Sequence, residues 1–320
     1  MPDCQKNCAS CQNSSPYLPS TEQISNSTGA IQLTSYPVFP GISLIFHDAH
    51  LQSYTQPAPF SGNLLEIHHC REGRMECHFR EEFYYISAGD LLVTRVQDLS
   101  RTTYFPLRHY HGISVVIDLD RAPKCLSCLL EDVTVQPELL AKKFCGEQNC
   151  FVARETPAFS HIFAEIYEVP EDIRKGYFKV KILELLLFLS AFQKNPEEIQ
   201  RIPFSDAQVT LAKNVAQFLT DHMEQRITLE QLTRQFHRSG TQIKDSFKGV
   251  YGVPIYSFIR TQKMESAAYA LEHTDKPISE IAGEHGYDNS SKFSEAFRSV
   301  KGISPKEYRL AQKQAKLQVN

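Results

Sequence analysis

The sequence predicts an α+β protein: an antiparallel β-barrel or sandwich with following helices, and then an all-α carboxy-terminal domain. Three observations predict this class. Short apolar runs divided by turn residues fill residues 31–118. Helical spacing of apolar residues begins after Pro123, and helix-start signals follow Phe204. A chain of 320 residues exceeds what one core usually organises, so we expect about two domains.

Composition and charge exclude several classes. With 42% apolar residues, 22% charged residues and only 14 Gly and 17 Pro, the chain is neither disordered nor collagen-like. The longest apolar run, residues 182–192, is shorter than the roughly 20 residues that span a bilayer, so no membrane segment is predicted. The first residues lack the pattern of a secretory signal, and we expect a cytoplasmic protein with reduced cysteines.

The net charge of -3 hides a difference between the two parts of the chain. Residues 205–320 carry 16 Lys and Arg against 13 Asp and Glu, whereas the remainder is acidic. A mildly basic unit attached to an acidic one is typical of a nucleic-acid reader with a regulatory domain.

Six strands are expected in the amino-terminal part. Glu72 and Gly73 are placed as a hairpin turn, and Gly89 tolerates the positive φ that a turn needs before the next strand. Short antiparallel strands of this kind close into a sandwich or barrel with a concave interior. The expected strands are residues 42–47, 64–70, 74–80, 83–86, 90–94 and 113–119.

Helices are expected at residues 158–169 and 176–192. The second helix carries apolar residues at three- and four-residue intervals and further apolar surface around the cylinder. It is either buried against the β domain or part of a subunit interface. Residues 195–198 and Pro203 then read as a linker. The expected parts are a polar Cys-containing tail (1–30), a β domain (31–122), a helical and dimerisation region with the linker (123–203) and a helical domain (204–312).

Four capping-box patterns mark helix starts in the last part: Ser205 with Gln208, Thr228 with Gln231, Ser239 with Gln242, and Ser304 with Glu307. Between the second and third caps, residues 229–236 and the helix after Ser239 have apolar faces that can meet only across a tight turn, which describes a helix-turn-helix. The same pattern recurs about 50 residues later, with Asp288 as the expected cap. A long helix over residues 254–271 joins the two units.

The carboxy-terminal part resembles the AraC/XylS-type transcription regulators. The first unit and the joining helix carry Leu229, Leu232, Phe247-Lys248 and Gly252-x-Pro254, and the second unit carries Ile278-Ser279-Glu280-Ile281-Ala282, Gly286-Tyr287, Phe293, Phe297-Arg298, 301–305 and Tyr308-Arg309. The amino-terminal part is similar to the family's cupin-like sensor domain through Leu65-Glu66-Ile67, Gly73 and Gly89-Asp90-Leu91-Leu92.

The resemblance implies two recognition helices in consecutive major grooves of double-stranded DNA. Residues on their outward faces are the expected base readers: Thr241, Gln242, Lys244, Asp245 and Lys248 in the first, and Asn289, Ser290, Ser291, Lys292 and Glu295 in the second. Arg238, Lys248 and Arg298 are placed for phosphates. Asp245 and Lys292 depart from the family's usual residue types and leave the preferred sequence open.

Cysteines offer a second kind of site. The spacing of Cys4, Cys8 and Cys11 can hold an iron-sulfur cluster, although the surrounding tail is polar. Four thiols in one short segment, Cys125, Cys128, Cys145 and Cys150, form a candidate zinc or iron-sulfur site. A free cysteine is also often a small buried apolar residue, and that alternative stays open.

Histidines are candidates for an effector or metal pocket inside the cupin-like domain. They are His68, His78, His109 and His111, and His109 and His111 would share one strand face. Structural histidines with satisfied hydrogen bonds are the alternative interpretation.

These observations predict a sequence-specific transcription regulator and not an enzyme. Binding of a small-molecule effector to the cupin-like sensor is expected to shift DNA-binding or dimer geometry. The resemblance implies activation through contact with RNA polymerase, and a homodimer is expected. The alternatives are a metal- or redox-sensing regulator that uses the cysteines, and a metal-dependent cupin enzyme with a DNA-binding appendage.

Overall fold

The computed structural model describes residues 18–56, 62–79, 82–124, 126, 135–146, 150–154, 156–193 and 203–318. The chain divides into two compact units, Met1–Ser205 and Asp206–Asn320. The first unit is an antiparallel sheet with helices and the second is all helical, as the sequence predicts. Within the described ranges, no helix combines the length and the apolar character that a bilayer crossing requires.

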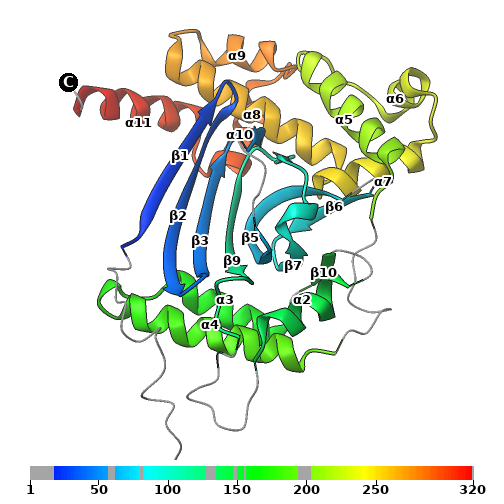
Figure 1. The fold of residues 1–320 in the computed structure, drawn as a ribbon. Helices are drawn as coiled ribbons and strands as arrows, with labels where there is room; N and C mark the ends of the chain where they lie inside the picture. Colours follow the sequence, from blue (N-terminus) through cyan, green and yellow to red (C-terminus); the bar gives the residue numbers. More distant parts are fainter. Residues whose placement is uncertain are drawn as a thin grey trace, which may run out of the picture. The chain divides into compact units, whose positions relative to one another are not determined.

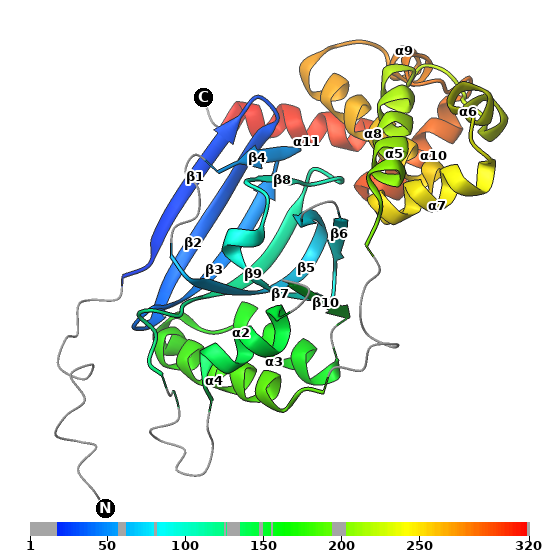
Figure 2. The same ribbon diagram turned by 45° about the vertical axis from the view of Figure 1, so that its right-hand side comes forward.

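The strands of the first unit form one antiparallel sheet in the order β1-β2-β3-β9-β5-β7-β10, and β4, β6 and β8 extend it beside β5 (Figures 1 and 2). The strands are β1 (Ser20–Asn26), β2 (Gly29–Phe39), β3 (Ile42–His50), β4 (Ser53–Thr55), β5 (Leu64–Phe79), β6 (Glu82–Ser87), β7 (Asp90–Arg95), β8 (Thr102–Tyr104), β9 (Tyr110–Asp118) and β10 (Cys150–Arg154). Strands β1, β2, β4, β8 and β10 were not among the predicted ones.

Each face of the sheet has its own apolar core because alternate residues of a strand point to opposite faces. Leu65 and Ile67 of β5 belong to the core that also contains residues of α2 (Pro137–Cys145), α3 (Pro157–Tyr167) and α4 (Arg174–Ala191). Cys70 and Cys77 of the same strand belong to the core on the other, concave face. Figure 1 shows the three helices lying across one side of the sheet.

The predicted hairpin turn at Glu72 and Gly73 is wrong, because β5 continues through these residues. A register shift between Cys70 and Glu72 bends the strand while both flanks stay paired with β9. Gly73 has a φ of 87°, and a Cβ there would lie 2.3 Å from the carbonyl oxygen of His109. Glycine therefore permits a bulge and a close strand approach at this position, and the chain does not reverse.

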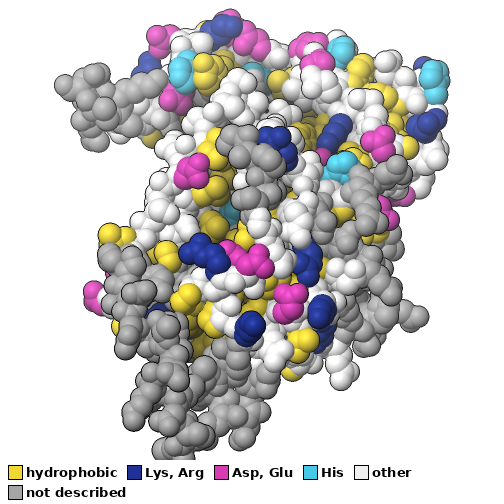
Figure 3. All heavy atoms as spheres, in the orientation of Figure 1, with side chains coloured by type: hydrophobic (Ala, Val, Ile, Leu, Met, Phe, Trp, Pro, Cys, Tyr) yellow, Lys and Arg dark blue, Asp and Glu magenta, His cyan; other side chains and the backbone are white. Residues whose placement is uncertain are grey.

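Helix α4 covers the sheet with the face that the sequence predicts to be apolar. Phe178, Ile182, Leu185, Leu186 and Leu189 are all buried. On the opposite side Val180 is 61% exposed and Phe188 is 42% exposed. Figure 3 shows hydrophobic side chains lying between Lys, Arg, Asp and Glu side chains on the face that carries the helices of the first unit.

The second unit consists of seven helices in its described residues, and α8 (Ile255–His273) belongs to both halves of it. The amino-terminal half of the unit contains α5 (Asp206–Asp221), α6 (Leu229–Phe236) and α7 (Gly240–Tyr251), and the ring of Phe258 of α8 packs edge-on against Phe247 and at a tilt against Tyr251 of α7. The other half contains α9 (Ile278–Glu284), α10 (Ser290–Lys301) and α11 (Pro305–Gln318), whose core includes Met264 and Leu271 of α8.

Candidate nucleic-acid interface

The first helix-turn-helix is built by two capping boxes in succession. At α6 the Thr228 hydroxyl accepts from the amide of Gln231, and the Gln231 side chain accepts from the amide of Thr228 at 2.7 Å. Ser239 and Gln242 repeat the arrangement at α7. Each box satisfies amides that the first helical turn leaves without a partner. The predicted starts of both helices are therefore confirmed.

Helix α7 buries one face and exposes the other. Ile243, Phe247 and Val250 are fully buried. The five predicted base readers of this helix, Thr241, Gln242, Lys244, Asp245 and Lys248, are all exposed, and so is Arg238 in the preceding turn. The side-chain oxygen of Gln242 is occupied by the capping box, so the donor groups of its amide remain for an external partner.

The second helix-turn-helix begins α10 one residue later than predicted. Asn289, and not Asp288, is the cap: its side-chain oxygen accepts from the amides of Ser291 at 2.8 Å and Lys292 at 3.3 Å. Asn289 was predicted to be a base reader, but this oxygen is used inside the helix start. Ser290, Ser291, Lys292, Glu295 and Arg298 are exposed. Ser290, Ser291, Glu295 and Arg298 border an open depression of about 610 Å³.

The recognition helices α7 and α10 are equivalent at an offset of 50 residues. Both have 12 residues and both end at a glycine with positive φ, Gly252 at 76° and Gly302 at 78°. At this offset the buried Phe247 corresponds to Phe297. The exposed positions correspond too, since Asp245 matches Glu295 and Lys248 matches Arg298. Each outward face therefore presents an acidic residue and, one turn later, a basic one.

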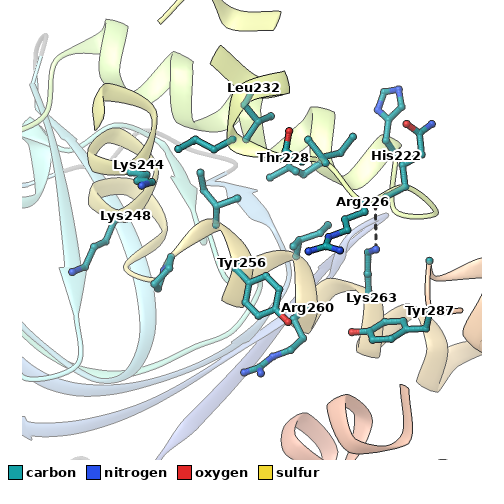
Figure 4. A pocket seen from close by; sticks show the side chains of 18 of the residues that line it. His222, Arg226, Thr228, Leu232, Lys244, Lys248, Tyr256, Arg260, Lys263 and Tyr287 are labelled. Carbon is teal, nitrogen blue, oxygen red and sulfur yellow. Dashed lines mark hydrogen bonds between the residues drawn. The ribbon is translucent and has the colours of Figure 1, made fainter. Parts of the chain in front are cut away.

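A cleft of about 860 Å³ lies between the two recognition helices (Figure 4). Its basic side chains come from four elements of the unit: Arg226 before α6, Lys244 and Lys248 of α7, Arg260 and Lys263 of α8, and Lys292 of α10. Asp245 is the acidic residue among its lining residues. The cleft connects the exposed faces of both helices through a surface of positive charge.

Three cleft residues of α8 have distinct environments. Tyr256 is 70% exposed, and the guanidinium of Arg260 lies 5.8 Å from the centre of its ring. The Nε atom of Arg260 is buried and has no hydrogen-bond partner among the described residues. Lys263 donates to the carbonyl oxygen of Gln225 at 3.3 Å, the dashed line in Figure 4, and burial lowers its pKa.

Sequence reasoning missed these α8 residues. Tyr256, Arg260 and Lys263 follow one another at intervals of four and three, which places them on one stripe of the helix. The spacing of these residues is visible in the sequence. Their place in the cleft, however, depends on both helix-turn-helix units packing against α8.

Comparisons with known proteins agree on the class of this domain. Residues 232–311 match the family described as helix-turn-helix domain. The HTH-type transcriptional regulator YdiP of Escherichia coli is 30% identical over 99 residues, which are 31% of this chain and 33% of that protein. The regulator YtdP of Bacillus subtilis is 22% identical over 71% of this chain and 31% of its own length. The carboxy-terminal part of the chain therefore carries a helix-turn-helix domain similar to those of HTH-type transcriptional regulators.

The helix-turn-helix domain is also similar to a solved structure. The C-terminal domain of AraT, a response regulator from Geobacillus stearothermophilus, is 31% identical, with a TM-score of 0.31 over 32% of this chain and 84% of that one. The chain spans about a third of the length of the two curated relatives. Those relatives are named as transcriptional regulators and not as enzymes.

The amino-terminal unit holds a polar cluster on the concave face of its sheet. His68 Nδ1 lies 3.1 Å from Oε1 of Glu66, and His47 Nε2 lies 2.7 Å from Oγ of Ser114. Burial, together with the nearby His68, lowers the pKa of His47 to about 3. Burial acts to raise the pKa of Glu66, but the hydrogen bond and the charge of His68 outweigh it, and the net shift is downward.

The predicted effector histidines do not come together. His68 lies in the concave cluster, whereas His78 stacks on Phe83 at 4.2 Å between ring centres. His109 approaches the carbonyl oxygen of Leu107, and His111 lies beside Asp48 in a separate, more exposed group. The members of the interior cluster that sequence reasoning missed are His47 and Glu66. No local signal identifies His47, because its position depends on the register of three strands.

The two described cysteines of the predicted thiol site lie on opposite sides of the sheet. Cys145, at the end of α2, belongs to the core on the helix side of the sheet, and Cys150, at the start of β10, belongs to the core on the concave side. The sheet therefore separates these two thiols. Cys125 and Cys128 lie outside the described residues, as do Cys4, Cys8 and Cys11.

Proposed function

We propose that this protein is a sequence-specific transcription regulator in which α7 and α10 read consecutive major grooves of one DNA duplex. The observation that carries this proposal is the pair of equivalent recognition helices, each with a polar, exposed outer face, on the two sides of a basic cleft. A helix whose apolar side is buried and whose polar side is free can enter the major groove of B-form DNA.

The roles of the exposed side chains follow from their chemistry. Thr241, Gln242, Lys244 and Asp245 of α7, and Ser290, Ser291, Lys292 and Glu295 of α10, supply hydroxyl, amide, ammonium and carboxylate groups for base edges. Arg238, Lys248 and Arg298 are assigned to phosphates, which add affinity without sequence information. Asn289 is assigned here to the start of α10, because its oxygen already accepts two amides.

Arg260 joins the phosphate-binding group. Its buried Nε has no partner among the described residues, and an unpaired buried donor is costly unless a ligand satisfies it. A phosphate between the two grooves would supply that acceptor, and guanidinium groups bind phosphate oxygens well. The exposed ring of Tyr256 beside it offers a hydroxyl to the same backbone.

The amino-terminal unit is proposed as a cupin-like sensor of a small-molecule effector. What supports this is the polar group on its concave face, which lies within a core of apolar residues. Such a mixture of apolar walls and few polar groups is typical of ligand sites. The remaining parts of the proposal are activation through RNA polymerase, a homodimer and a cytoplasmic location. The exposed Val180 and Phe188 of α4 offer apolar surface for the dimer.

The DNA-binding proposal is tested by selecting binding sites from random duplexes with two variants. Lys244→Ala is expected to change the preferred bases at the half-site that α7 reads, because it removes a base contact. Arg298→Ala is expected to leave the preferred sequence unchanged and to weaken binding to all sites alike. It should also reduce the slope of log affinity against log salt concentration by about one. An unchanged preference for Lys244→Ala would refute the assignment of α7 as a base reader.

A further inference from the structure

We propose that His47, Glu66 and His68 form a binding site for one divalent transition-metal ion inside the β domain. Their donor atoms all lie within 4.8 Å of one another. Two imidazoles and one carboxylate are a common ligand set for Zn²⁺ and for non-haem Fe²⁺. The site deepens the sensor part of the proposed function, because Glu66 and His68 belong to the polar group assigned there, and it does not depend on DNA binding.

The sheet brings the three donors together across three strands. Glu66 and His68 are alternate residues of β5 and therefore point to the same face. Strand β9 lies between β5 and β3, with Ser114 opposite both His68 and Ile45 and Gly112 opposite both Cys70 and His47. A Cβ at Gly112 would lie 2.8 Å from the ring and from the hydroxyl of Tyr110, so the missing side chain leaves room for the Tyr110 hydroxyl beside His68. The donors therefore converge although His47 lies 19 residues before Glu66 in the sequence.

The distances suit a metal after a small adjustment. Ligand atoms bound to one ion at about 2.0 to 2.2 Å lie about 3 to 3.5 Å apart. The 3.1 Å between His68 Nδ1 and Glu66 Oε1 already falls in that range. The other donor separations are no greater than 4.8 Å, and side-chain rotation can shorten them.

A hydroxyl group contacts one nitrogen of each imidazole. His68 Nε2 contacts the hydroxyl of Tyr110, and His47 Nε2 contacts Oγ of Ser114. In the tautomer whose Nε2 carries the proton, each ring donates to its hydroxyl and leaves the Nδ1 lone pair for a metal. Metal-binding histidines almost always have such a partner, which fixes the ring orientation and the tautomer. Ser114 also hydrogen-bonds to Glu66 and so orients two of the three donors.

Burial distinguishes this cluster from a second one of the same composition. The side chains of His68 and Glu66 are 3% and 13% exposed, and Ser114 and Tyr110 are fully buried. Asp48, His50 and His111 also lie within 4.8 Å of one another. However, Asp48 and His50 are 52% and 62% exposed, so water competes there for every donor. The interior group is the better site, and the surface group is a matched control.

The test is titration of the full chain with Co²⁺ alone, followed by the visible absorption of the bound ion. One equivalent is expected, with bands of nitrogen and oxygen ligands. Glu66→Gln is expected to weaken binding by well over tenfold, and Tyr110→Phe by about tenfold or more, because it removes a partner of His68 without changing the donor set. Asp48→Asn, in the surface cluster, is expected to leave affinity unchanged.

Folding and the other metal-binding groups are checked in the same experiment. The circular dichroism of each metal-free variant shows whether it is folded, and Tyr110→Phe keeps the test valid if Glu66→Gln does not fold. Bound Co²⁺ should also raise the melting temperature of the wild type but not of Glu66→Gln. Unchanged affinity in both interior variants overturns the proposal. So does loss of binding in Asp48→Asn, or a strong thiolate-to-cobalt band, which would place the ion on cysteines.

Discussion

At the scale of single residues, the features that sequence reasoning recovered are those that act over three or four positions. The capping boxes at Thr228, Ser239 and Ser304 are formed by pairs three residues apart, and all three are present. Residues whose roles depend on distant partners were missed. His47 became part of a cluster only through the register of β3, β9 and β5, and Arg260 became a cleft residue only through packing of two units on α8.

Arg260 provides a residue-scale prediction about DNA affinity. Arg260→Ala is expected to weaken binding to specific and random duplexes alike and to flatten the dependence on salt, because it removes a phosphate contact without a base contact. The matched control is Arg234→Ala, since Arg234 is exposed on α6, forms an ion pair with Glu230 and does not line the cleft. Binding isotherms at several salt concentrations measure both. Equal slopes for the two variants would remove Arg260 from the interface.

Ser304 provides a prediction about pH. Its hydroxyl and backbone amide lower the pKa of Glu307, so this carboxylate stabilises the folded state above the ordinary pKa of a glutamate, and the contribution disappears as pH falls through the lowered value. Ser304→Ala is therefore expected to raise the pKa of Glu307 and to cost more stability at neutral pH than at pH about 3. An NMR titration of the carboxyl group measures the first effect and denaturant unfolding the second.

Thr228→Ala is the control for this pH dependence. Its partner Gln231 does not ionise, so the loss should be about 1 kcal/mol of unfolding free energy at either pH. A cost of Ser304→Ala that does not vary with pH would contradict the assigned role of Glu307.

At the scale of elements, the periodicity of apolar residues located α4, α7 and α10, because each has one buried face. The strands were harder to predict. The chain bends at Gly73 without reversing, and positive φ is equally compatible with a hairpin turn and with a bulge. Only the continued pairing of Glu72 and Gly73 with β9 distinguishes the two.

Three glycines near the second recognition helix give a graded prediction. Gly286 has a φ of 73°, and a Cβ there would lie 2.7 Å from the carbonyl oxygen of Glu224, whereas Gly302 has a φ of 78° and open space. Gly302→Ala should cost about 1 kcal/mol for conformation alone, and Gly286→Ala about 2 to 4 kcal/mol because crowding is added. Gly283→Ala, in helical backbone with open space, should instead stabilise by about 0.5 kcal/mol.

Urea unfolding of the three variants tests this order. Equal costs at Gly286 and Gly302 would mean that the turn of the second helix-turn-helix relaxes to accept a side chain.

At the scale of the whole molecule, composition and periodicity predicted two different architectures in one chain, a sheet with helices and an all-helical unit. The density of local signals explains why the second unit was the better predicted. Its helices have separate start signals and a repeated order, whereas the sheet joins β3, β9 and β5, which lie far apart in sequence. The concave cluster therefore depended on information that no short segment contains.

The length of α8 also fixes the rotation of α10 relative to α7 about the axis of α8. Its 19 residues rise about 28 Å, somewhat less than the roughly 34 Å pitch of a B-form duplex, and each residue adds a rotation of about 100°. Since the helix belongs to the cores of both halves, inserting one residue would rotate α10 relative to α7, and under the proposed function the two helices could then no longer enter consecutive grooves together. The length of α8 would thus set the spacing and the relative orientation of the two recognition helices along the DNA.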